Sequence, residues 1–170
     1  QNYAQTLSPT QMARWKQALN AKEPLQIVTL EEALNASMKK GKGVASASPP
    51  KKTWIYKADN VRDFAWTSSR RFVWDAMSTM IEGKKVMSMS YYAKEAYPIY
   101  SKYSTKAVAH TLRTYSKFSI PYPYPVAISV EGNQGMEYPM ISFNPGRANP
   151  DGSYTEGSKN AAILVIIHEV

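Results

Sequence analysis

The hydrophobic residues of this chain repeat with two different periods, and this mixture constrains the fold more than any other sequence feature. Near the N-terminus they recur at helical spacing, whereas between residues 52 and 91 several segments alternate as β-strands do. The second half repeats the mixture, with a helical pattern up to residue 118 and an extended segment at 126–130. A chain in which both periods recur is predicted to be an α+β protein.

Two capping-box patterns mark helix starts near the N-terminus. Ser8–Gln11 and Thr29–Glu32 each place a hydroxyl residue three positions before Gln or Glu, and Pro follows the first hydroxyl. These patterns predict helices over about 9–21 and 30–38. The Gly, Ser, Lys and Pro content of 39–52 predicts a loop.

The middle of the chain is predicted to be rich in β-structure. Its candidate strands alternate between large apolar and polar side chains and are rich in aromatic and β-branched residues. They cover residues 52–57, 63–66, 72–77 and 85–91. We expect them to be the closing strands of a β-rich unit whose beginning lies before Gln1.

The second half is predicted to contain a helix capped by Ser104 or Thr105, then extended segments, and then a buried last segment. The buried stripe of this helix is expected to consist of Val108, Leu112, Tyr115 and Phe118. Alternating prolines then lead into a strand at 126–130, a second extended segment at 136–143 and a loop at 144–157. The last segment, 158–170, is apolar all round, which predicts burial but does not decide between strand and helix.

Composition narrows the classes of function. The chain has no cysteine, which excludes disulfides and cysteine-ligated metals, and its longest apolar run, Ala161–Ile167, is too short to span a membrane. The net charge of +8 comes mostly from residues 1–90, where scattered Lys and Arg pairs are expected to form a solvated surface. We therefore expect no nucleic-acid partner, although a basic nucleic-acid-binding protein stays the least favoured alternative.

The pair His168-Glu169 at the end of the apolar segment is the sharpest chemical signal. In a zinc-protease helix, two His four residues apart bind the metal, and the Glu after the first His acts on the bound water. Only the first half of that pattern is present before Val170. The alternative is a helix end at which the His caps carbonyl groups or packs in the core.

A second segment strengthens the metal-site interpretation. Gly135-Met136-Glu137 follows a predicted strand and lies 31 residues before His168, counted from Glu137. The segment resembles the Gly-x-Met-Glu-Asn exopeptidase motif of the gluzincin zinc aminopeptidases, the family of membrane alanyl aminopeptidase and leukotriene hydrolase. The segment Val61–Thr67 also resembles the end of the family's N-terminal β domain, so the resemblance covers roughly residues 54–170.

The resemblance implies a role for each matching residue. Glu137 would bind the free α-ammonium of a peptide substrate, while Gly135 and Met136 would present backbone groups to that extended peptide. His168 would be the first zinc ligand, and Glu169 would be the general base. Zinc is thus the implied cofactor, and peptides with a free N-terminus are the implied substrates.

Two departures from the family pattern bear on specificity. Gln134 replaces the first Gly of the motif and Tyr138 replaces its Asn, and either change could reshape the first substrate pocket. The second His, a further Glu ligand and a transition-state-stabilising Tyr would all follow Val170. The chain is therefore expected to be an incomplete fragment, inactive alone, whose main partner is the remainder of its parent polypeptide.

The resemblance also implies a domain organisation. Residues 1–90 would be the C-terminal part of a β-rich domain with a helical insertion at about 6–52. Residues 91–170 would begin a thermolysin-like catalytic domain, and the family favours a secreted or cell-envelope location. A non-catalytic relative that binds peptides or partners without turnover is the main alternative to the enzyme.

Overall fold

The computed structural model describes residues 2–38 and 51–170. It contains both helices and a mixed sheet, which confirms the predicted α+β class. In chain order they are α1 (Tyr3–Thr6), α2 (Pro9–Ala18), β1 (Leu25–Val28), α3 (Leu30–Met38), β2 (Val73–Ile81), β3 (Lys84–Tyr92), α4 (Tyr97–Phe118), β4 (Val126–Glu131), β5 (Met136–Tyr138), β6 (Ile141–Asn144) and α5 (Glu156–Glu169).

The strands that the structure describes form one six-stranded mixed sheet in the order β1-β2-β3-β4-β6-β5. β2 runs antiparallel to both of its neighbours, β1 and β3, whereas β3, β4 and β6 run parallel to one another. The helix α4 makes the crossover from β3 to β4, as parallel strands require. β5 returns antiparallel to β6 and ends the sheet at one edge.

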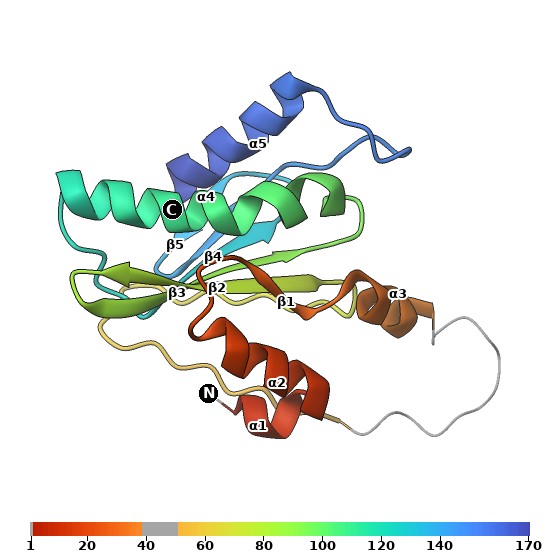
Figure 1. Cartoon of the computed structure of the whole chain (residues 1–170), viewed down its shortest axis with the longest axis horizontal. Coiled ribbons are helices and arrows are strands. Elements are labelled where there is room, and N and C mark those ends of the chain that lie inside the picture. The colour runs from red at the N-terminus through yellow and green to blue at the C-terminus, as the bar shows by residue number, and fades with distance from the viewer. Residues whose placement is uncertain (1, 39–50) are drawn as a thin grey trace.

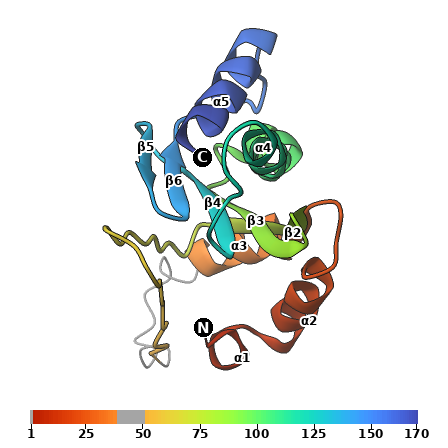
Figure 2. The same ribbon diagram turned by 90° about the vertical axis from the view of Figure 1, so that its left-hand side faces the viewer.

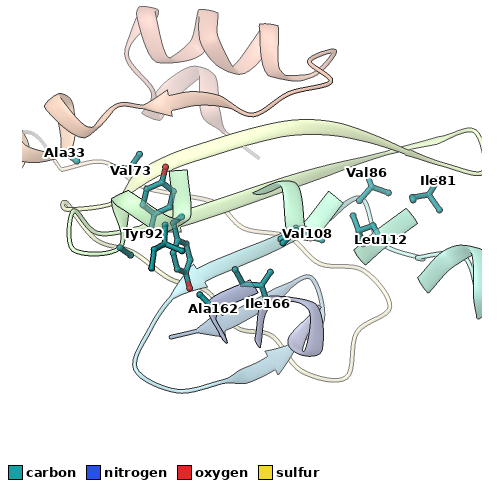
Figure 3. Close-up of a cluster of buried hydrophobic side chains, with 14 residues drawn as sticks. Ala33, Val73, Ile81, Val86, Tyr92, Val108, Leu112, Ala162 and Ile166 are labelled. Carbon is teal, nitrogen blue, oxygen red and sulfur yellow. The ribbon is translucent and has the colours of Figure 1, made fainter. Parts of the chain in front are cut away.

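Helices cover both faces of this sheet (Figure 1). α4 and α5 lie on one face, and α1 and α2 lie on the other, against β1 and β2. One apolar cluster therefore fills the space beneath α4 and α5, where Ala162 and Ile166 of α5 meet the residues of α4 (Figure 3). A second cluster beneath α1 and α2 contains Trp74, Met87 and Met89.

Both predicted N-terminal helix starts are confirmed. The Ser8 hydroxyl accepts a hydrogen bond from the backbone N–H of Gln11 at 3.2 Å, and the Gln11 side chain accepts one from the N–H of Ser8 at 3.1 Å. Thr29 and Glu32 form the same reciprocal pair at 3.2 and 2.8 Å. The helix predicted over about 9–21 is α2, and it ends at Ala18 rather than near residue 21. The loop predicted at 39–52 lies outside the described residues, apart from its last two residues.

The strands predicted at 52–57 and 63–66 are wrong, because no residue between 51 and 72 is in a strand. In this stretch, backbone groups form hydrogen bonds with a side chain rather than with a partner strand. Asn2 donates from Nδ2 to the carbonyl of Thr53 at 2.8 Å and accepts from the N–H of Ile55 at 2.9 Å. Alternating side chains alone do not make a strand, and within the described residues no second strand pairs with this stretch.

The helix predicted to begin at Ser104 or Thr105 begins earlier, at Tyr97. Pro98 lies in its first turn, where a missing backbone N–H costs no hydrogen bond. The predicted buried stripe is correct in its first half and wrong in its second. Val108 and Leu112 are buried, whereas Tyr115 is 47% exposed and Phe118 is 77% exposed, because α4 extends past the edge of the cluster it covers.

The N-terminal region contains more than the predicted helices. β1 lies within the segment interpreted as a helical insertion, and it pairs with β2 in the main sheet. Residue 90 lies inside β3, which pairs with β2 on one side and with β4 on the other, so the sheet continues across that position. The assignment of 1–90 and 91–170 to two domains stays a prediction. Among the described helices, none has the length and apolar character to cross a bilayer.

Candidate functional site

The segment that carries the Met-Glu pair folds as a hairpin at the edge of the sheet. The predicted extended segment 136–143 divides into β5 and β6, which are joined by Pro139 and Met140. Met140 has a positive φ of 71°, in the position after Pro that takes this conformation in a type II turn. Figure 2 shows β5 as the outermost strand, so one of its backbone edges faces away from the sheet.

Alternation along β5 directs its side chains to opposite faces of the sheet. Glu137 is paired with Ser142 of β6, and Ser142 is paired with Ser129 of β4, which lies beneath α4. Glu137 therefore points to the face that α4 and α5 cover. Met136 points to the opposite face and is 45% exposed, so its side chain does not join Glu137.

The apolar C-terminal segment is a helix, which settles the alternative that its sequence left open. Thr155 and Ser158 form a reciprocal capping box, with the Thr155 hydroxyl accepting from the N–H of Ser158 at 3.0 Å. The prediction of burial on all sides is wrong. Ala162 and Ile166 are buried against α4 and β6, whereas Leu164 on the outer face is 64% exposed.

The hairpin and α5 bring three of the predicted site residues together. The carboxyl group of Glu169, in the last turn of α5, lies directly against Gly135 and close to the side chain of Glu137. A β-carbon at position 135 would overlap Oε1 of Glu169 and would lie 3.2 Å from its Cδ and 3.7 Å from Cγ1 of Val165. Only a residue without a side chain admits the carboxyl group at this distance.

The neighbourhood of Glu169 favours its neutral form. Desolvation raises the pKa of the Glu169 carboxyl, and the hydrogen bond and negative charge of Glu137 raise it further. His168 has the opposite, smaller effect, since its positive form would stabilise the carboxylate. Two carboxyl groups that share one site resist simultaneous ionisation, which makes the pair attractive to a cation.

His168 is exposed beside Glu169 at the end of α5. Among the residues that the structure describes, no group of three or more His, Cys, Asp or Glu side chains is placed to hold a metal ion. Since catalytic zinc takes three protein ligands, the described residues do not form a catalytic zinc site by themselves.

An ion pair between a buried carboxylate and a half-exposed arginine supports the strand that leads to this site. Glu131, the last residue of β4, has a side chain that is 2% exposed and accepts from Nε of Arg147 at 2.6 Å. The next residue, Gly132, donates its N–H to the carbonyl of Asn144 at 3.0 Å. These bonds fix the start of the turn at 132–135, and sequence reasoning identified neither of them.

The space beside the two carboxylates is small. A hollow of about 10 Å³ lies between Tyr138, Ser142 and Glu169, which is about enough for one water molecule. A larger apolar groove of about 320 Å³ lies between the C-terminal end of α4 and the segment 119–123, and Val170 also lines it.

Comparison with known proteins gives no family assignment. No protein-family model matches this chain, and no curated protein matches it.

Proposed function

We propose that this chain belongs to a zinc-dependent aminopeptidase, to which it contributes the amine-binding carboxylate and the general base. The observation that carries the proposal is the meeting of Glu137 and Glu169. One lies on an edge strand and the other in the last turn of a helix, and their carboxyl groups lie close enough for Glu137 to raise the pKa of Glu169.

Glu137 is the proposed anchor for the substrate's α-ammonium. Its side chain is exposed at the edge of the sheet and has another carboxyl group beside it, so a cation would find two acceptors. An ammonium-carboxylate hydrogen bond is charge-assisted and is lost when the amine is acylated. This contact would restrict cleavage to free N-termini.

Glu169 is the proposed general base. A base is most effective when its pKa lies near the working pH, and the raised pKa of Glu169 is a shift in that direction. Its position against Gly135 holds the carboxyl group at one place beside the edge strand. From there it would take a proton from the water that attacks the scissile carbonyl.

Zinc is the proposed cofactor, with His168 as one ligand. When bound, zinc supplies a Lewis acid and lowers the pKa of its water to near neutrality. The remaining ligands are proposed to follow Val170 in the parent polypeptide, as the resemblance to gluzincin aminopeptidases implies. The proposal includes a thermolysin-like fold for the catalytic domain and a secreted or cell-envelope location.

The proposed substrate is an extended peptide that lies along β5. This strand pairs with β6 on one side only, among the residues that the structure describes. A peptide added to the open side could bond to the backbone of Gly135 and Met136 while its ammonium reaches Glu137. The side chain of Met136, which points to the other face, would not contact that ammonium.

The proposal is tested by metal analysis and turnover of the parent polypeptide. We expect one zinc per chain, release of single N-terminal residues from short peptides, and loss of turnover in Glu169→Gln with retained zinc. The 170-residue chain should hold no stoichiometric zinc, because it supplies one imidazole where catalytic zinc takes three protein ligands. A parent that binds free-amine peptides without cleaving them would instead be the non-catalytic relative.

A further inference from the structure

A row of polar side chains crosses the sheet on the face that α4 and α5 cover. Register pairs join Asp75 to Ser90, Ser90 to Ser129, Ser129 to Ser142, and Ser142 to Glu137. Residues paired in this way point to the same face of a sheet. The row therefore runs from a buried carboxyl group in β2 to the proposed amine anchor in β5.

Asn144 holds the end of this row that is nearest to Glu137. Its Nδ2 donates to the hydroxyl of Ser129 at 2.9 Å and to the hydroxyl of Ser142 at 3.2 Å. The side chain is completely buried, and buried amides are rarely retained without such bonds. Asn144 thus ties β6 to β4 from beneath.

The backbone of the same residue holds the turn that enters β5. Its carbonyl accepts from the N–H of Gly132 at 3.0 Å and from the Tyr100 hydroxyl at 2.6 Å. Tyr100 is buried in α4, which supports the network from above. Asn144 consequently connects α4, β4, β6 and the turn that leads to Glu137.

We propose that Asn144 is a positioning residue for Glu137, acting through Ser142. The proposal rests on the proposed aminopeptidase function for its kinetic part but not for its structural part. β5 has three residues and pairs with β6 alone among the described strands, so the position of Glu137 follows that of β6. The Asn144 amide fixes β6 against β4, and Ser142 lies directly opposite Glu137.

Ser104 provides a matched control for the network. It is as fully buried as Asn144, and its hydroxyl bonds to Ser90 at 2.8 Å and to Ser129 at 3.2 Å. It lies on α4, and among the described residues its hydroxyl forms no hydrogen bond with β6 or with the turn at 132–135. Like Asn144→Ala, Ser104→Ala should therefore lower the free energy of unfolding through the loss of buried hydrogen bonds, but it should not move β5.

The experiment combines hydrogen exchange with kinetics. Amide exchange in residues 132–138 is measured for the full chain and for Asn144→Ala, Ser142→Ala and Ser104→Ala, with the unfolding free energy of each variant. We expect amide exchange at 132–138 to be at least about tenfold faster in the first two variants, because local opening of this segment no longer requires the Asn144 hydrogen bonds to break. Ser104→Ala should leave this segment unchanged beyond the global loss of stability.

In the parent enzyme, Asn144→Ala and Ser142→Ala should raise KM for free-amine peptides at least about tenfold, because small misplacements of a binding group are costly. Ser104→Ala should leave KM unchanged. Should Asn144→Ala fail to fold, Ser142→Ala decides the question. Unchanged exchange at 132–138, or a rise in KM no larger than that of Ser104→Ala, would overturn the positioning role. An absence of any turnover in the wild type would refute the proposed function and leave the exchange result to decide on its own.

Discussion

The carboxyl group of Glu169 occupies the place where residue 135 would carry a side chain. Gly135 lies at the start of the edge hairpin and Glu169 in the last turn of α5, and the Cδ atom of Glu169 is 3.2 Å from the position of a β-carbon on Gly135. The proposed amine-binding segment and the proposed base are therefore in direct contact. This contact brings Glu137 and Glu169 into one site.

Substitution of Gly135 should move the base. In Gly135→Ala, the added methyl group overlaps Oε1 of Glu169, so the carboxyl group must rotate away. Since misplacement of a catalytic group by about 1 Å can cost about 100-fold, we expect kcat of the parent enzyme to fall by roughly that factor. Steady-state kinetics with a free-amine peptide measures it.

Gly132→Ala is the control for this prediction, because a β-carbon there would meet Cβ of Phe143 at 3.5 Å, an ordinary contact. That variant should retain near wild-type kcat. Equal losses in the two variants would mean that the turn at 132–135 tolerates no side chain for reasons unrelated to Glu169.

The packing of α5 depends on a second close approach. A β-carbon on Gly146 would lie 2.8 Å from Cε2 of Tyr100 and 2.9 Å from Cβ of Ala162, and both neighbours are buried. Gly146→Ala should lower the free energy of unfolding by about 1–3 kcal/mol, the usual cost of overpacking. Urea denaturation measures this change.

Gly157→Ala is the matched comparison for Gly146→Ala. It lies in the first turn of α5, where the nearest atom to a β-carbon is Oγ1 of Thr155 at 3.7 Å. Because Ala is favoured over Gly in a helix, this change should stabilise the chain by up to about 0.5–1 kcal/mol. A destabilising Gly157→Ala would show that the first turn of α5 is strained.

Asp75 should make the chain less stable as the pH rises. Its side chain is 1% exposed, and burial raises the pKa of its carboxyl group to about 7 although the Tyr92 hydroxyl donates to it at 2.5 Å. The folded pKa lies above the unfolded value of 3.8, so the folded chain binds the proton more tightly. The stabilisation is complete below about pH 4 and is lost as the pH rises to about 7, with a total of up to about 4 kcal/mol.

The pH dependence is checked by urea denaturation of the wild type and Asp75→Asn between pH 4 and pH 8. The free energy of unfolding of the variant should depend much less on pH than that of the wild type, since its amide does not ionise. Asp59→Asn, which removes an exposed carboxylate bonded to Lys57, should retain the wild-type slope. A wild-type profile in Asp75→Asn would assign the dependence to other groups.

The sequence predicted those elements of the fold whose signals are local. The capping boxes at Ser8 and Thr29 involve residues three positions apart, and both form as predicted. The strands β2, β3 and β4 also lie where alternating side chains and β-branched residues placed them. Each of these signals lies within a few residues of the element that it defines.

The failures concern partners that lie far away in the sequence. The alternation at 52–57 resembles a strand, but the Asn2 side chain takes the hydrogen bonds that a neighbouring strand would make. The four-residue β1 was missed because its pairing with β2 is not visible in so short a pattern. Whether Tyr115 is buried depends on where the core ends, which periodicity along the helix does not reveal.

The candidate site was predicted only in part. The resemblance singled out Glu137 and Glu169, and the structure brings them together through the hairpin and α5. No sequence signal indicated Asn144, whose role follows from the pairing of β4 with β6. Serines at alternate strand positions, such as Ser88 and Ser90, are the one local hint of a polar layer beneath a helix.

The central claim is tested most directly by comparing free and N-acetylated forms of one short peptide as substrates of the parent enzyme and of Glu137→Gln. The account predicts that the wild type cleaves only the free-amine peptide. Glu137→Gln should lose at least about 100-fold in kcat/KM on that peptide and with it the preference for a free N-terminus, because the charge-assisted bond to the ammonium is gone. Equal cleavage of both peptides by the wild type, or an unchanged preference in Glu137→Gln, would contradict it.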